Sequence, residues 1–415
     1  MITSHLKIAG KVLLRRKFFT FVSLFGTAFT LVVLMVVAAI FDAVVSPAAP
    51  EVNLDRTLFI SHMAMRGPEN EWTGSPGYGF LDRYCRDIPG VVAMSIFTES
   101  GSSLGFVDGR KIESQLRRTD GNYWTLHGFR FLEGRPYSEE DVANAASVAV
   151  ISAGTRTRFF GEGAALGRTL ETGGRAYTVV GIVSDVPRIR EAAYADIWTP
   201  LTTTKTDDYK SRLMGNFTGA LLIRSARDIP AIRAEFQRRL PTVQLTDPAS
   251  YDRMEGSPRT RFEELVGEAA GTSGDDERPR TGLFLLGLSL ATLLFMALPA
   301  INLVNLNISR MLERSSEIGI RKAFGATSGH LVAQFLVENL VLVLISGAVG
   351  LVASAWALEL INRSGWIPNA SFHVNGRVFV EALLLCLLFG FISGVYPAWR
   401  MSRLEAVDAL KGGSR

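Results

Sequence analysis

The sequence predicts an α-helical membrane protein with four transmembrane helices and a large extracytoplasmic α+β domain inserted between helices 1 and 2. The first observation is that 47% of the 415 residues are hydrophobic, with a mean hydropathy of +0.20. The second is that residues 18–41, 281–309, 340–358 and 382–399 contain no charged residue, and about 20 apolar helical residues span a bilayer core. The third is that the stretch between the first two blocks is polar and contains short runs rich in β-branched residues.

These observations divide the chain into nine predicted segments. They are a basic cytoplasmic N-terminal segment (1–17), a first transmembrane helix (18–45), the extracytoplasmic domain (46–280), a second helix (281–309), a cytoplasmic loop (310–330), a third helix (331–360), a short extracytoplasmic loop (361–377), a fourth helix (378–400) and a cytoplasmic tail (401–415). A cleavable signal peptide is the alternative for the first helix. Its apolar region would have about 7–15 residues, so the longer block 18–41 favours an anchor.

The distribution of lysine and arginine predicts the orientation, because cytoplasmic loops carry an excess of both. Basic residues precede the first helix and occur in the loop after the second helix and in the tail: Lys7, Lys11, Arg15, Arg16, Lys17, Arg310, Arg314, Arg321, Lys322, Arg400, Arg403, Lys411 and Arg415. The other short loop carries only Arg363 and Arg377. We therefore expect both termini and the loop after the second helix in the cytoplasm, and residues 46–280 outside.

The extracytoplasmic domain shows strand and helix patterns but no catalytic motif. Runs at 91–97, 147–151, 177–183 and 219–223 predict strands, residues 229–240 predict a helix, and Ser138 followed by acidic residues predicts an N-cap. His62 and His127 stand alone in the sequence, and no metal-ligand spacing or nucleophile motif is present. We therefore expect no enzymatic activity and no metal site.

Other classes of protein are disfavoured by charge and cysteine content. The net charge of +4 comes mostly from basic residues placed by membrane topology. These residues do not cluster with aromatic residues on one soluble face, so nucleic-acid binding is not expected. Cys85 and Cys386 are predicted to lie outside and inside the membrane, respectively, so no disulfide is expected. The nearest approach to a phosphate-binding loop, residues 161–169, lacks lysine and the required glycine spacing.

The cytoplasmic loop contains a short amphipathic pattern, SEIGIRKAFGA, which we call the 316–326 segment. Glu317 and Arg321 are four residues apart in the favourable order, which stabilises an isolated helix by about 0.2–0.5 kcal/mol. Ile320 and Phe324, also four apart, form an apolar edge. The pattern predicts a short helix with one charged edge and one apolar edge.

Two glycines within this segment have different expected roles. Gly325 suits a helix C-cap. Gly319 would cost about 1 kcal/mol relative to alanine inside a helix, which indicates close approach by another surface. The alternative is an ordinary basic loop that only follows the positive-inside rule, and the physical pattern alone leaves both interpretations open.

The 316–326 segment strongly resembles the cytoplasmic coupling helix of the MacB/FtsX-like ABC transporter permeases, whose signature is roughly E-I-G-I-R-[KR]-A-[LF]-G-A. Residues 331–338 resemble the Q-F-L-x-E start of the family's third helix, and residues 394–398, which include Pro397, its G-x-Y-P-A motif. Further similarity to the MacB-like periplasmic core domain occurs at residues 123–124, 134–135, 141, 148–152, 159–161, 167–169 and 179–183. The resemblance therefore extends over almost the whole chain.

The resemblance implies a multi-pass permease subunit of the bacterial cytoplasmic (inner) membrane that couples ATP hydrolysis to conformational work outside the membrane. It implies no cofactor in this chain, with ATP and Mg bound by an ATPase that we expect on a separate chain. The implied partners are a cytoplasmic ABC ATPase dimer, a second permease subunit that is identical or different, a periplasmic adaptor in some members, and the lipid bilayer. The implied ATPase-coupling residues are Glu317, Ile318, Gly319, Ile320, Arg321, Lys322, Phe324 and Gly325.

Several residues within the predicted helices are candidates for packing or polar roles. An intramembrane carboxylate indicates function, and for Glu338 we favour snorkelling or an inter-subunit hydrogen bond over a proton relay. Pro299 is expected to kink the second helix. The remaining candidates are the polar Asn302 and Asn305, the small Gly347 and Gly350, which suit close helix packing and dimerisation, and Pro397.

The transported substrate is not specified by any motif, and export of a peptide, lipid, lipoprotein or drug-like molecule is expected. One alternative is a cell-division-type regulator that gates a cell-wall hydrolase, although that branch usually has smaller external domains. Another is a sensor or resistance permease that signals to a histidine kinase, although such permeases usually have more membrane helices.

Overall fold

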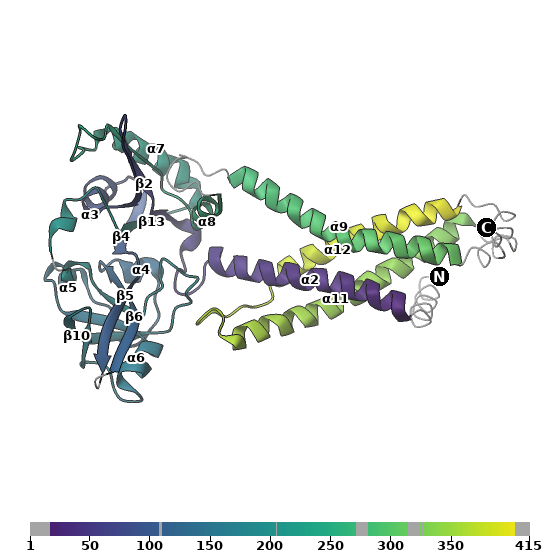
Figure 1. Ribbon diagram of the computed structural model, residues 1–415, viewed down its shortest axis with the longest axis horizontal. Helices are drawn as coiled ribbons and strands as arrows, with labels where there is room; N and C mark the ends of the chain where they lie inside the picture. Colours follow the sequence, from purple (N-terminus) through teal and green to yellow (C-terminus); the bar gives the residue numbers. More distant parts are fainter. Residues whose placement is uncertain are drawn as a thin grey trace. The chain divides into compact units, whose positions relative to one another are not determined.

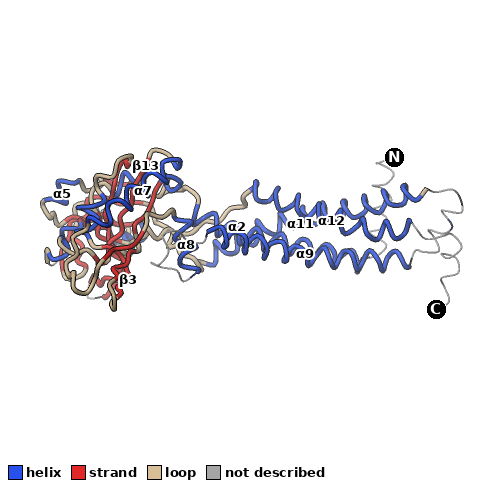
Figure 2. Tube along the Cα trace, turned by 90° about the horizontal axis from the view of Figure 1, so that it is seen from above, coloured by secondary structure: helices blue, strands red, loops and turns tan. Residues whose placement is uncertain are grey.

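The computed structural model describes residues 17–107, 110–204, 206–270, 281–313, 320, 324 and 327–402. The chain divides into two compact units, and Figure 1 labels many of their helices and strands. We call residues 42–284 with 365–371 the α/β unit, and the remainder the helical unit. Figure 2 shows that the strands all lie in the α/β unit.

The helical unit is built from α2 (Lys17–Val45) as far as Phe41, α9 (Thr281–Glu313) from Leu285 onward, α11 (Ser328–Ser364) and α12 (Gly376–Ser402). Each contains a span that is long and apolar enough to cross a membrane, which confirms the four predicted transmembrane helices. The buried centre of this unit is formed by Leu31, Met296, Leu342, Val343, Ala382 and Cys386. Phe21, Phe25 and Phe29 recur every fourth residue on an exposed face of α2, as expected for a helix whose solvent is lipid.

The α/β unit contains fourteen strands among the described residues. They are β1 (Thr57–Ile60), β2 (Met63–Arg66), β3 (Glu71–Pro76), β4 (Val91–Thr98), β5 (Gly101–Val107), β6 (Arg110–Thr119), β7 (Phe131–Gly134), β8 (Val148–Ser152), β9 (Thr169–Thr172), β10 (Arg175–Val183), β11 (Ile197–Pro200), β12 (Met214–Gly215), β13 (Phe217–Ile223) and β14 (Arg253–Gly256). Its helices are α3 (Tyr78–Phe80), α4 (Tyr123–His127), α5 (Glu139–Ala143), α6 (Ala153–Phe160), α7 (Ile229–Arg239) and α8 (Arg261–Ala270).

The strands form two sheets. The larger has the order β1-β13-β4-β6-β11-β8-β10-β9-β5, with β7 also paired to β10, and the smaller has the order β12-β3-β2-β14. Most pairs are antiparallel, but β10 with β8 and β11 with β6 are parallel. β13 lies between β1 and β4, and all seven of its residues are buried, which explains its continuous apolar run.

The local predictions for this unit are confirmed. The four predicted strands correspond to β4, β8, β10 and β13, and the predicted helix corresponds to α7, which has proline in its first turn. Ser138 forms a capping box with Asp141 at the start of α5. The Arg135 guanidinium hydrogen-bonds to Asp141 and lowers the pKa of that carboxyl.

Glycine at position 134 is required by its surroundings. Gly134 has φ of +72°, and a Cβ atom there would lie 2.2 Å from the carbonyl oxygen of Val180. Both the left-handed backbone and this close approach exclude other residues. The glycine noted in the sequence at the end of β7 therefore permits the pairing of β7 with β10.

An aromatic cluster fills the centre of the α/β unit. Trp124 of α4 contacts Trp198 of β11 with ring centroids 6.1 Å apart, and Tyr123 contacts the His127 ring at 4.5 Å. His127 is 1% exposed, and no hydrogen-bond partner for its Nε2 is present among the described residues. Burial, with a smaller contribution from the nearby Arg117 charge, lowers the pKa of His127 to about 3, so the ring is neutral in the folded protein.

Candidate functional site

The 316–326 segment is described at two of its predicted coupling residues. Ile320 is 49% exposed and Phe324 is 89% exposed. The Phe324 N–H donates to the Ile320 carbonyl oxygen at 3.1 Å, which is the spacing of one helical turn. The two apolar side chains are thus a turn apart and both are accessible; the other predicted members, Glu317, Ile318, Gly319, Arg321, Lys322 and Gly325, lie outside the described residues.

Glu338 lies in the helical unit with a partner on its own helix. The residue is 6% exposed, and its carboxylate accepts a hydrogen bond from Gln334 Nε2 at 3.1 Å. Asn339 is also buried, and its Nδ2 has no partner in the described part of the chain. Pro299, Asn302 and Asn305 lie in α9 and Pro397 lies in α12, but their side chains are outside the described set.

The two glycines predicted for helix packing contact neighbouring helices of the same chain. A Cβ atom at Gly347 would lie 2.6 Å from Leu383 Cδ1 of α12, and one at Gly350 would lie 3.1 Å from Leu31 Cβ of α2. These contacts explain the absence of side chains at both positions. The close-packing face of α11 therefore serves contacts within the chain, and its role in dimerisation stays a prediction.

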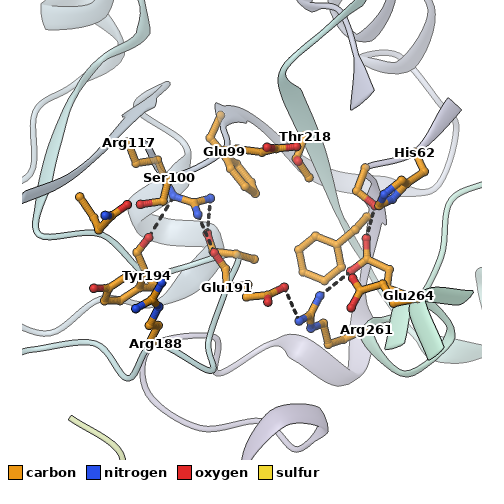
Figure 3. A pocket seen from close by; sticks show the side chains of 16 residues that line it. His62, Glu99, Ser100, Arg117, Arg188, Glu191, Tyr194, Thr218, Arg261 and Glu264 are labelled. Carbon is orange, nitrogen blue, oxygen red and sulfur yellow. Dashed lines mark hydrogen bonds and ion pairs between the residues drawn. The ribbon is translucent and has the colours of Figure 1, made fainter. Parts of the chain in front are cut away.

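The α/β unit contains a cavity of about 360 Å³ with polar walls. Figure 3 shows charged side chains of both signs around it. Its walls come from β1 and the link to β2, from β4, β6 and β13, from the loop of residues 187–194, and from α8. The aromatic rings of Phe59 and Phe97 also line it.

One wall of this cavity is an ion-pair network centred on Arg261 of α8. Arg261 Nη2 lies 2.7 Å from Glu191 Oε2, and Nη1 lies 3.2 Å from Glu264 Oε2. Burial raises the pKa of Glu264, and Arg261 opposes that rise. Although burial disfavours its charge, the carboxylates of Glu264 and Glu191 raise the pKa of Arg261, so the network holds a permanent cation between two acids.

A serine, a histidine and a glutamate meet beside this network. Ser61 Oγ donates to Glu264 Oε1 and lies 3.1 Å from His62 Nδ1, and burial, together with Arg259, lowers the pKa of His62. In a hydrolytic triad the carboxylate orients the histidine from its other nitrogen. Here the carboxylate binds the serine directly, so the arrangement does not match a serine-hydrolase site.

Arg117 of β6 forms the opposite wall and is held by backbone oxygens. Its Nε, Nη1 and Nη2 donate to the carbonyl oxygens of Tyr194, Ala192 and Glu191 at 3.3, 2.9 and 2.5 Å. The guanidinium carbon also lies 5.1 Å from the centroid of the Phe97 ring, a cation–π distance. Burial lowers the pKa of Arg117, but carbonyl dipoles and the ring stabilise its charge.

No motif or spacing in the sequence predicts this cavity. His62 belongs to no motif in the sequence, but in the structure its neighbour Ser61 contacts its ring and also binds Glu264. The residues around the cavity come from strands and a helix that are distant in sequence, so no spacing rule could bring them together. Chemically, its mixed charges favour a polar or charged occupant over an apolar one.

Two family models match this chain. Residues 20–239 match the MacB-like periplasmic core domain, and residues 289–406 match the FtsX-like permease C-terminal region. These ranges contain the motifs of the α/β unit and the 316–326 segment, respectively.

Individual relatives share about a quarter of their aligned residues with this chain. The chain is 25% identical over 360 residues to the macrolide export ATP-binding/permease protein MacB of Neisseria gonorrhoeae, covering 81% of this chain and 51% of that protein. It is 25% identical over 347 residues to the uncharacterized ABC transporter permease YknZ of Bacillus subtilis, covering 80% and 79%. The chain spans about half the length of the relatives named as ATP-binding/permease proteins, 43% and 51% in two of them.

Part of this chain is also similar to a solved domain structure. The extracellular domain of the noncanonic ABC-type transporter YknZ from Gram-positive bacteria aligns with a TM-score of 0.35 and 15% identity, covering 48% of this chain and 98% of that chain.

Proposed function

Since this chain belongs to the MacB/FtsX-type family of ABC transporter permeases, we propose that it couples ATP hydrolysis on a separate cytoplasmic ATPase to conformational work of its extracytoplasmic domain. In this proposal the α/β unit is the extracytoplasmic domain and the 316–326 segment is the contact for the ATPase. The chain itself is non-catalytic, and ATP and Mg bind to the partner.

The observation that supports the proposal best is the exposed apolar pair Ile320 and Phe324. Aromatic side chains are enriched among the residues that contribute most to binding at protein interfaces, and these two apolar side chains lie one helical turn apart. The segment lies between α9 and α11 in the chain, so a force applied to it acts on two membrane helices. In the family the corresponding segment is the coupling helix.

The proposed contact has an apolar centre and a polar edge. Ile320 and Phe324 insert into a groove of the ATPase, while Glu317, Arg321 and Lys322 form polar contacts around it. Gly319 lacks a side chain and allows the two backbones to approach closely. Dimerisation of the ATPase on ATP binding then moves the segment, and rigid helices transmit the displacement.

The proposed assembly contains two permease subunits, two ATPase subunits and, where an outer membrane exists, a periplasmic adaptor. The termini lie in the cytoplasm and the membrane is the bacterial cytoplasmic membrane. The work done outside is export of a peptide, lipid, lipoprotein or drug-like molecule.

We expect Phe324→Ala to weaken binding of the ATPase to the full-length chain by about 2 kcal/mol, or about thirtyfold in Kd, since a buried aromatic anchor is lost. The measurement is the affinity of the purified ATPase subunit for the chain in nanodiscs. Phe106→Ala is the matched control, because Phe106 is 57% exposed on β5 of the α/β unit. Equal affinity of wild type and Phe324→Ala would contradict the assignment.

A further inference from the structure

The loop of residues 187–194, which we call the junction loop, is bonded to the end of the first membrane helix. Arg190 Nη1 donates to the Ser46 carbonyl oxygen at 2.7 Å and lies 3.3 Å from Glu51 Oε2. Ser46 directly follows α2, and its N–H donates to the Asp42 carbonyl oxygen at 2.9 Å, which continues the helical hydrogen bonding. The last turn of α2 is therefore joined to the junction loop by a charged side chain.

The pair formed by Arg190 and Glu51 is almost completely inaccessible. The two side chains are 5% and 4% exposed. Burial raises the pKa of Glu51, and the charges of Arg190, Arg261 and Arg117 oppose that rise. A buried ion pair carries a large desolvation cost and is weak support for stability by itself, whereas loss of one partner leaves an uncompensated charge. Because both side chains are enclosed, the pair has little freedom to rearrange. It is therefore suited to hold the end of α2 and the junction loop in a fixed relation.

The same loop is bonded to two other segments of the α/β unit. The Arg188 N–H donates to the Pro368 carbonyl oxygen at 3.5 Å, and Pro368 lies in the connection between α11 and α12. Glu191 pairs with Arg261 of α8 at 2.7 Å, and α8 precedes α9 in the chain. One short loop thus contacts the residue that follows α2, the connection between α11 and α12, and α8.

The junction loop is also fixed to the larger sheet. Arg117 of β6 binds the carbonyl oxygens of residues 191, 192 and 194. The Tyr123 hydroxyl donates to the carbonyl oxygens of Ala192 and Ala193 at 2.9 and 3.1 Å. A displacement of the loop would therefore move β6 and α4, to which it is hydrogen-bonded. It would also shift the cavity wall that the loop forms.

We propose that Arg190 and Glu51 are positioning residues. They transmit movement of the first membrane helix through the junction loop to the larger sheet of the α/β unit. This inference rests on the proposed function, because it names where ATP-driven movement enters the extracytoplasmic domain. Neither residue touches nucleotide or substrate; both act through the loop that they hold.

Hydrogen exchange of the full chain with its ATPase in nanodiscs, with and without ATP and Mg, tests the inference. In wild type we expect ATP to change amide exchange in the 316–326 segment, in residues 46–54 and in residues 188–194. If ATP changes exchange in the 316–326 segment and elsewhere in the α/β unit but in neither of the last two segments, the inference is wrong. If ATP changes exchange nowhere in the chain, the proposed function fails instead.

Variants of the Arg190–Glu51 pair distinguish a role in transmitting movement from a role in stabilising the fold. Glu51→Gln with Arg190→Met removes both charges together and so avoids leaving one buried charge alone. We expect this double variant to keep the exchange response of the 316–326 segment and to lose the response of β6 and α4. Arg135→Met is the matched control, because Arg135 pairs with Asp141 at 2.9 Å but is 59% exposed. Arg190→Lys, which keeps the charge, is expected to restore part of the response. A double variant that responds in β6 and α4 like wild type would overturn the inference.

Discussion

Glu317→Lys is expected to uncouple ATP hydrolysis from movement of the extracytoplasmic domain while leaving the protein inserted in the membrane. In the proposed interface Glu317 pairs with a basic group of the ATPase, and the substitution replaces attraction with repulsion. Loss of one partner of a buried charged pair at an interface typically costs about 2–5 kcal/mol, which corresponds to at least about thirtyfold in affinity. The ATPase should therefore turn over without responding to the permease.

The measurement is the ATPase rate of the reconstituted complex, with and without the permease, together with membrane insertion of the variant. Glu359→Lys is the matched control, because Glu359 lies near the other end of α11, is 52% exposed and pairs with Arg363. We expect Glu359→Lys to behave like wild type. Normal coupling in Glu317→Lys would show that the 316–326 segment is not the contact.

Acid is expected to destabilise the α/β unit through His127. The folded-state pKa of about 3 lies below the ordinary histidine value of about 6.5. The unfolded chain therefore binds a proton that the folded chain does not, and stability falls as the pH drops from about 6.5 towards 3. At pH 4.5 the loss from this residue alone is about 3 kcal/mol, since each pH unit contributes about 1.4 kcal/mol.

His127→Phe removes this proton-binding group while keeping an aromatic ring in the cluster. We expect the free energy of unfolding of this variant minus that of wild type to be about 3 kcal/mol larger at pH 4.5 than at pH 7, because only wild type loses stability through protonation of His127. Thermal unfolding of the full chain in detergent, followed by tryptophan fluorescence, measures it, because Trp124 and Trp198 lie in the same cluster. His373→Phe changes an exposed histidine and serves as control. If the variant and wild type lose the same stability between pH 7 and pH 4.5, His127 does not control acid stability.

Features set by local pattern could be predicted from the sequence. Uncharged blocks located the four helices, because a bilayer core accepts few charges. β13 and α7 followed from continuous or periodic apolar residues, and Ser138 from its capping pattern. The family was recognised from ordered motifs, and both family models confirm it.

Features that depend on tertiary contact could not be predicted. Glu51 and Arg190 are 139 residues apart, and nothing in the neighbourhood of either indicates that it is buried. Ser61 and Glu264 meet only because β1 and α8 pack together. Gly347 and Gly350 were identified as packing residues, but their partners on α12 and α2 were set by the fold of the helical unit.

Photo-crosslinking from position 324 tests the coupling of this permease to a cytoplasmic motor most directly. A benzophenone amino acid replaces Phe324, which is 89% exposed, and intact cells are irradiated before the crosslinked proteins are identified. The same amino acid at Val92, which is 60% exposed on β4, reports on the extracytoplasmic side. We predict that position 324 captures an ABC ATPase and position 92 does not; capture of extracytoplasmic proteins from position 324, or of no ATPase, would contradict the proposed coupling.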